Sequence, residues 1–194
     1  MNSATPTRSI FLVGINHKYQ VSPADCYCTN LGVSESESSK FREMLKTAIG
    51  LHDIKGIAEE MSADGLIKIM GIDQARALRQ HPEFQDLPEP VERNSIGFNL
   101  AKDLDLLHRY CDPSIAIRKA RNFNLPRDRE PYWIEQLRTF DGFPTLFILG
   151  ADHVSSFTQL LKDSGFQAVV LAADWESTSC SVLPTDANPP IMPT

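Results

Sequence analysis

Two short motifs in the sequence place a histidine at the same distance after an apolar segment. "SIFLVGINH" runs from Ser9 to His17, and "TLFILGADH" runs from Thr145 to His153. In each motif a glycine follows the apolar residues and the histidine comes three positions later. Glycine lets a chain turn sharply and lets another group approach its backbone. Imidazole titrates near neutral pH and is a common metal ligand, so both histidines are candidates for acid–base or metal chemistry.

Carboxylates follow another short apolar segment of the chain. Glu59 and Glu60 come directly after a predicted strand, and His108 and Asp112 follow a third one with a weaker signal. Two imidazoles and one or two carboxylates at one site suit a divalent metal ion or general acid–base catalysis. The alternative is that Glu59 and Glu60 are solvated carboxylates that open the next helix, where the helix dipole favours them. A histidine after a strand-ending glycine is also often a surface residue.

Apolar strands alternate with amphipathic helices along the chain. Helices are expected from Ser34, which forms a capping box with Glu37, and over about 62–79, 95–101, 127–140 and 154–165. Strands are expected at about 9–14, 53–58, 104–110, 145–149 and 167–172. This alternation predicts an α/β fold, a three-layer α/β/α arrangement with a mainly parallel sheet of about five strands. The carboxyl ends of parallel strands share one edge, so the candidate side chains are expected to meet there.

The composition is that of a globular protein. The chain has 194 residues, a net charge of −6 and a pI of about 5.3, which argues against nucleic-acid binding. Its apolar runs are too short to span a bilayer, and its N-terminus resembles no signal peptide, so we expect no membrane association and a cytoplasmic location. The four cysteines are expected to be free thiols. We expect a flexible N-terminus (1–8), a single α/β domain (9–175) and a loosely ordered tail (176–194).

Four segments together resemble the TraB/Tiki/ChaN-like superfamily, a broad group that includes erythromycin esterases. They are "VGINH", the "EE" after the second strand, "RDREPYWIEQL" and "LFILGADHVSSFTQLLKDSGF". The resemblance extends from about residue 9 to residue 174. It implies an α/β domain with its site at one sheet edge, in a group with metal-dependent proteases, haem- or iron-associated members and esterases that use a histidine base. The residues that match are Gly14, His17, Glu59 or Glu60, Arg129, Glu130, Gly150 and His153.

This resemblance and the residues together predict a hydrolase of peptide or ester bonds. His17, His153 and Glu59 would hold a divalent ion (Mn, Zn or Fe), or one histidine would activate water directly. Gly14 and Gly150 would lie at the cofactor. Glu60 or Glu130 would move the proton, and Arg129 would stabilise the developing oxyanion. Arg129 has an alternative as a solvent-exposed partner of a neighbouring carboxylate.

The same sequence features are compatible with other functions. The same edge could hold a small ligand or a metal in a non-catalytic sensor or interaction module. Asn16 favours this reading, because many relatives carry an acidic residue beside the first histidine. A nucleotide-binding domain is disfavoured because only one glycine follows the first strand, and the chain has no G-x-S-x-G motif for a serine nucleophile. The expected ligand is a small molecule or a peptide, and the sequence leaves open whether the chain forms a homodimer.

Overall fold

The computed structural model describes residues 8–20, 34–69, 73, 76–77, 79–84 and 94–176. Its centre is a five-stranded sheet in the order β3-β2-β4-β1-β5, and every strand pairing is parallel. The predicted α/β fold is therefore confirmed. The strands are β1 (Ser9–Ile15), β2 (Gly56–Glu59), β3 (Leu107–Tyr110), β4 (Thr145–Gly150) and β5 (Gln167–Trp175).

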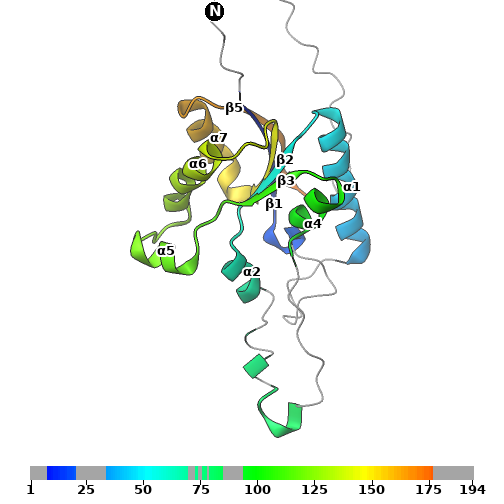
Figure 1. Ribbon diagram of the computed structural model, residues 1–194, viewed down its shortest axis with the longest axis vertical. Helices are drawn as coiled ribbons and strands as arrows, with labels where there is room; N and C mark the ends of the chain where they lie inside the picture. The colour runs from blue at the N-terminus through cyan, green and yellow to red at the C-terminus, as the bar shows by residue number, and fades with distance from the viewer. Residues whose placement is uncertain are drawn as a thin grey trace, which may run out of the picture.

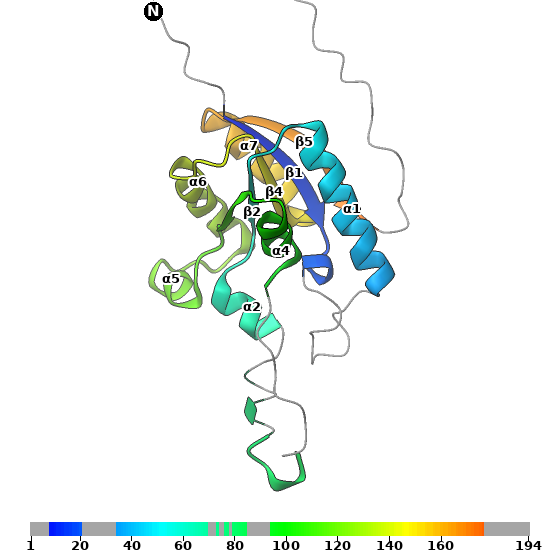
Figure 2. The same cartoon turned by 45° about the vertical axis from the view of Figure 1, so that its right-hand side comes forward.

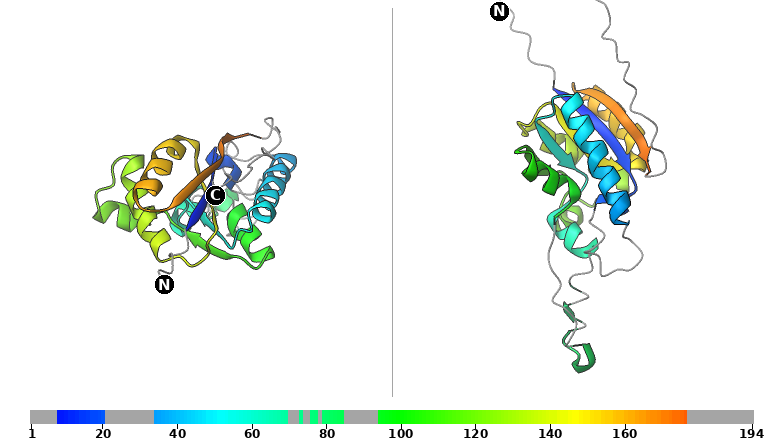
Figure 3. Two further views of the ribbon diagram at one scale, coloured as in Figure 1. Left: turned by 90° about the horizontal axis from the view of Figure 1, so that it is seen from above. Right: turned by 90° about the vertical axis from the view of Figure 1, so that its right-hand side faces the viewer.

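Helices cover both faces of the sheet (Figure 1). On one face, α1 (Glu35–Leu51) and α4 (Ile96–Asp103) pack against alternate residues of β1, β2 and β4. On the other face, α6 (Glu130–Arg138) and α7 (Val154–Asp163) pack against the intervening residues. Figure 3 shows the sheet between these two helical layers. Two apolar clusters, one on each face, form the core.

The remaining helices are short and connect the larger elements. They are α2 (Ala63–Ile69), α5 (Ile115–Ala120) and the 3-10 turns η1 (His17–Gln20), η3 (Pro82–Phe84), η4 (Pro126–Arg129) and η5 (Ala151–His153). η5 begins directly after β4, η1 is separated from the end of β1 by one residue, and η4 leads directly into α6. These turns carry the candidate side chains of the site.

The strand order brings the two glycine–histidine motifs side by side. β1 and β4 are neighbours in the sheet (Figure 2). Ile15 lies opposite Gly150. β2 lies on the other side of β4, with Glu59 opposite Ile148. Three segments that are far apart in sequence therefore end at one edge of the sheet, as expected for parallel strands.

Local sequence explains where several elements begin and end. The capping box at Ser34 and Glu37 opens α1 as predicted. Gly165, with a φ of 87°, follows the end of α7, a left-handed conformation that glycine adopts without steric cost. Two strands begin later than predicted, because Asp53 and Asp105 have φ values of 50° and 53° and turn the chain before β2 and β3.

Some sequence predictions fall outside the described residues. These are the predicted N-terminal segment up to residue 7, three of the four cysteines (26, 28 and 180) and the tail from residue 177 onward. The predicted helix over 62–79 is described without gaps only as far as Ile69. Cys111 is a free thiol, fully buried. In the described ranges, no helix combines the length and the apolar character needed to cross a membrane.

Candidate active site

Glu60 is the centre of a hydrogen-bonded group at the carboxyl edge of the sheet. It follows β2 directly and is 3% exposed. Its Oε1 accepts a hydrogen bond from an Arg129 NH2 group at 3.0 Å, and its Oε2 accepts one from the Gly150 backbone N–H at 2.7 Å. The Nε2 atoms of His153 and His17 lie 3.5 and 3.9 Å from the same Oε1. One buried carboxylate therefore joins the ends of β1, β2 and β4 to η4.

His153 lies between two carboxylates. Its Nδ1 donates to Glu130 Oε1 at 2.7 Å, and the Ser156 hydroxyl donates to that same oxygen at 2.7 Å. The hydrogen bond to Glu130 raises the pKa of His153, with burial acting in the opposite direction and the negative charge of Glu60 adding to the increase. The second ring nitrogen, Nε2, faces Glu60. The pair of carboxylates thus favours the imidazolium form, which can donate a proton from Nε2.

His17 has a different hydrogen-bonding partner. Its Nδ1 lies 2.7 Å from the amide oxygen of Gln20, three residues later on the same 3-10 turn. An amide oxygen can only accept a hydrogen bond, so Nδ1 carries the proton and the neutral ring has its lone pair on Nε2. The His17 side chain is 48% exposed. Its Nε2 is therefore placed as a proton acceptor that solvent can reach.

Arg129 is held by a second buried carboxylate, Asp112. One guanidinium nitrogen of Arg129 donates to both Asp112 oxygens, each at 2.8 Å. The indole N–H of Trp133 donates to Asp112 Oδ1 at 3.0 Å, and Arg118 also pairs with Asp112. Arg129 Nε donates to the Pro126 carbonyl at 3.2 Å. These contacts fix the guanidinium between Asp112 and Glu60, so Arg129 is not the solvated surface residue of the alternative reading.

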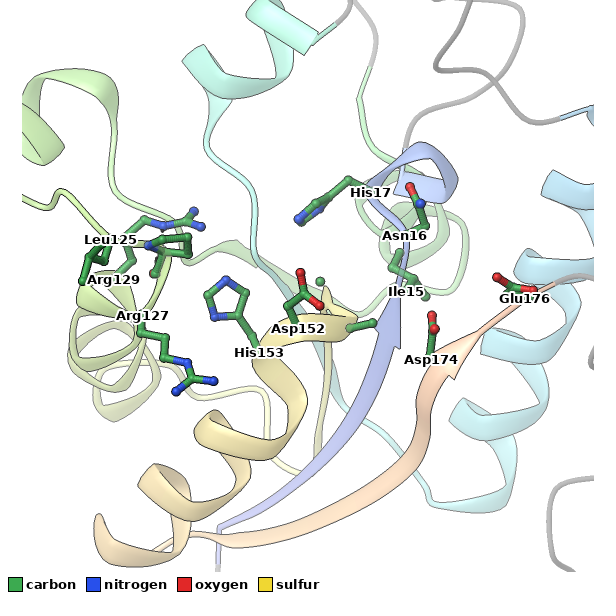
Figure 4. A pocket seen from close by; sticks show the side chains of 13 residues that line it. Ile15, Asn16, His17, Leu125, Arg127, Arg129, Asp152, His153, Asp174 and Glu176 are labelled. Atoms are coloured by element: carbon green, nitrogen blue, oxygen red, sulfur yellow. Dashed lines mark hydrogen bonds between the residues drawn. The ribbon is translucent and has the colours of Figure 1, made fainter.

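Two cavities meet at these side chains. The larger, about 690 Å³, lies between η4, η5 and the ends of β1 and β5, and we call it the α7-side pocket. The smaller, about 370 Å³, lies between η1, the start of α2 and Asp112, and we call it the α2-side pocket. Both are lined by Asn16, His17 and Arg129. In Figure 4, His17 and His153 point into the same open space from two different elements.

The two motif glycines provide space in the structure. A side chain at Gly150 would place its Cβ 2.8 Å from His17 Nε2 and 3.2 Å from Glu60 Oε2. A side chain at Gly14 would collide with the Ala173 carbonyl oxygen and with Val154. Neither glycine has a left-handed backbone. Gly150 therefore allows His17 to approach the strand end, whereas Gly14 allows close packing of β1 against β5 and α7.

The structure separates Glu59 from the two motif histidines. Glu59 is fully buried on the α4 side of the sheet, where it accepts hydrogen bonds from His108 Nε2 at 2.8 Å and from the Ser95 hydroxyl. Successive side chains of a strand point to opposite faces of the sheet, so Glu59 and Glu60 cannot face the same site. The expectation that Glu59 acts with His17 and His153 is not met, and Glu60 occupies that position.

The donor set does not fit a divalent metal ion. Among the described residues, no three or more His, Cys, Asp or Glu side chains are grouped so that they could hold one. The two oxygens of Glu60 already accept hydrogen bonds from Arg129 and Gly150, and His153 Nδ1 is bonded to Glu130. The predicted Mn, Zn or Fe ion stays a prediction.

Most of the residues singled out in the sequence lie together. The structure groups His17, His153, Glu60, Arg129 and Glu130, and with them Asp112, the candidate with the weaker signal after β3. Gln20 and Ser156 were missed, although each follows a motif histidine by three residues, a spacing that brings side chains together on a helical turn. Cys111 lies apart from this group in the core, where burial raises the pKa of its thiol, so it is no nucleophile.

Comparisons of the chain with protein-family models, with curated proteins and with solved structures found no match in any of the three. The resemblance to the TraB/Tiki/ChaN-like superfamily therefore stays a prediction from the sequence motifs.

Proposed function

We propose that the protein is a hydrolase that cleaves an ester or peptide bond with a histidine-activated water molecule. The observation that carries the proposal is that two histidines with different hydrogen-bond partners face one buried carboxylate beside a cavity. His17 presents a lone pair on Nε2, and His153 presents an N–H on Nε2. Pairs of titratable groups whose environments favour different protonation states are typical of acid–base sites.

His17 is the general base of the proposed reaction. Its Nε2 takes a proton from a water molecule, whose oxygen attacks the carbonyl carbon of the substrate. The hydrogen bond to Gln20 holds the ring in the required tautomer and stabilises the proton on Nδ1. Half of the His17 side chain is exposed, so a water molecule can reach this nitrogen.

His153 and Arg129 act on the other side of the reaction. The tetrahedral intermediate carries a negative oxygen, which the positive charges of Arg129 and of the His153 imidazolium stabilise. When the carbonyl–oxygen or carbonyl–nitrogen bond breaks, His153 Nε2 gives its proton to the leaving alcohol or amine. His153 then takes a proton from solvent, and Glu130 and Glu60 stabilise the imidazolium that forms again. His17 releases its proton to solvent, which restores the site.

A second function has one observation in its favour. Arg129 already makes four hydrogen bonds to protein acceptors. A guanidinium that is bonded in this way can serve to hold Glu60 and Asp112 in place without touching a substrate. The same edge would then be a non-catalytic binding site for a small ligand.

The experiment that tests the proposal is a hydrolysis assay with matched variants. Wild type, His17→Asn, His153→Asn and Arg129→Lys are assayed on 4-nitrophenyl esters, amino-acid 4-nitroanilides and short peptides. Loss of a general acid or base is expected to lower kcat/KM by about 10²–10⁴-fold. The control is His81→Asn, because His81 is exposed and lies outside both cavities.

Each outcome of the assay has a distinct meaning. Turnover by wild type and by the His81 variant, with loss in both site-histidine variants, supports the proposal. Equal rates in wild type and His17→Asn contradict it. Saturable ligand binding without turnover favours the binding protein. Metal analysis of the same samples tests the metal prediction, and near-stoichiometric metal that is lost in His17→Asn would contradict the metal-free route.

A further inference from the structure

The α2-side pocket offers more hydrogen-bond donors than acceptors. Three cationic side chains line it, those of Lys18, Arg118 and Arg129, together with the carboxylates of Glu60 and Asp112. Both carboxylates are buried and already accept hydrogen bonds from arginines. The negative charges in this pocket are therefore compensated before any ligand enters.

Lys18 supplies an ammonium group without a carboxylate partner. Its Nζ lies 4.8 Å from the centre of the Tyr19 ring, and no described carboxylate forms an ion pair with it. Lys18 follows His17 directly on η1, so its position is tied to that of the proposed base. The ammonium charge makes the pocket as a whole positive, since two carboxylates face three cations.

Arg118 and Asn16 add further donors to this wall. Arg118 uses Nε on the Pro113 carbonyl and one terminal nitrogen on Asp112, and its other terminal nitrogen has no acceptor among the described residues. The Asn16 side-chain oxygen accepts from the Lys18 backbone N–H at 3.1 Å, so its amide nitrogen remains as a donor. Ammonium, guanidinium and amide donors in one small cavity match the acceptor oxygens of an anion.

The α7-side pocket has more carboxylates in its lining. Asp152, Asp174 and Glu176 line it, together with Arg127, Arg129 and the His153 ring. Figure 4 shows Asp174 and Glu176 at the end of β5, on the wall opposite η4. An anionic group is repelled from that wall and attracted to the α2-side pocket. The two cavities thus orient a charged substrate across His17 and Arg129, which line both.

We infer that the α2-side pocket binds an anionic group of the substrate, a carboxylate or a phosphate, while the bond to be cleaved lies at His17. This inference rests on the proposed hydrolase function. It names the substrate class as esters or amides whose acyl or leaving part carries an anion a few bonds from the reacting carbonyl. The α2-side pocket has a volume of about 370 Å³, at the lower end of the range for small-molecule sites, which is enough for a short acid.

The first test compares two esters that differ only in charge. Mono-4-nitrophenyl glutarate has a free carboxylate, and its methyl ester at that end is neutral. Wild type is expected to cleave the anionic ester with a kcat/KM about tenfold higher, the effect of one charge-assisted hydrogen bond, mainly through KM. Lys18→Met is expected to abolish this preference. Lys162→Met, an exposed substitution on α7, is the control.

The second test needs no turnover. Binding of glutarate, inorganic phosphate and neutral glutaramide is followed by NMR through the backbone amides of Asn16 and Lys18. Saturable binding of either anion, weakened about tenfold in Lys18→Met, supports the inference even if no ester is cleaved. The phosphate and glutarate arms identify which anion fits. Equal binding of glutarate and glutaramide, or no binding of any of the three ligands, overturns the inference, also when hydrolysis itself is observed.

Discussion

Replacing Gly150 with alanine tests whether His17 must approach the strand end closely. The new Cβ would lie 2.8 Å from His17 Nε2, and ordinary van der Waals contact begins at 3.4 Å, so the ring has to retreat by about 0.6 Å. The Glu60 Oε2 atom, at 3.2 Å from the same Cβ, must also give way slightly. Gly150 has no left-handed backbone, so alanine adds crowding without backbone strain.

The displacement of the His17 ring is small, but His17 is the proposed general base. A displacement of about 1 Å in a catalytic group can cost on the order of 10²-fold in rate, so we expect kcat/KM to fall by about 10- to 100-fold. The free energy of unfolding is expected to fall by about 1–3 kcal/mol, the usual cost of crowding, and the half-exposed ring can rotate outward to relieve part of it. Ring ¹⁵N NMR signals of His17 are expected to move, whereas those of His81 stay unchanged.

The matched control for this substitution is Gly50→Ala. Gly50 lies near the end of α1, and nothing stands within 4 Å of the Cβ that alanine would add. Alanine there is expected to leave the rate unchanged and to stabilise the helix by about 0.5–1 kcal/mol. If Gly150→Ala leaves both the His17 ring signals and the rate as they are in wild type, the assignment of His17 to the site is refuted.

Four further substitutions probe the site and the neighbouring buried carboxylates. Glu130→Gln removes the hydrogen-bonded charge that raises the pKa of His153. A raised histidine pKa stabilises the fold most below the unfolded pKa of about 6.5, and this effect is lost as the pH rises through the folded pKa, so the variant's loss of unfolding free energy should be largest below about pH 6.5. The alkaline limb of its pH–rate profile should move to lower pH. Glu60→Gln should lower kcat/KM by on the order of 10²-fold, whereas Glu59→Gln should retain the rate and lose about 1–3 kcal/mol in urea unfolding, and the reverse pattern would contradict the division between the two faces. Trp133→Phe removes an indole hydrogen bond to a buried carboxylate and should cost about 1–3 kcal/mol, while an unchanged stability would show that this bond is not needed.

The order of elements was predictable from the sequence because the pattern of apolar residues changes visibly between strands and helices. All five predicted strands are present, and the capping box of α1 forms as expected. The predicted starts of β2 and β3, at residues 53 and 104, lie three residues before the observed starts at Gly56 and Leu107. Asp53 and Asp105 take left-handed conformations there, which follow from tertiary packing and leave no clear signal in the sequence.

The order of strands in the sheet determines which side chains lie close together, and this order could not be predicted from the sequence alone. That β1 and β4 are neighbours, with β2 next to β4, is a property of long-range pairing. The choice between Glu59 and Glu60 was within reach, because two successive strand residues face opposite sides of a sheet. Assigning the face required knowing that Ala58 packs under α6 and α7 while Ile57 packs under α1 and α4.

The most direct test of the account is the rate of ester or amide hydrolysis by wild type and by His17→Asn, purified side by side and measured across pH. Wild type is expected to turn over the substrate at a rate that falls at high pH, where His153 loses its proton. The rate is expected to fall by about 10²–10⁴-fold in His17→Asn. Equal hydrolysis by both proteins at every pH would contradict the central claim that His17 activates the attacking water.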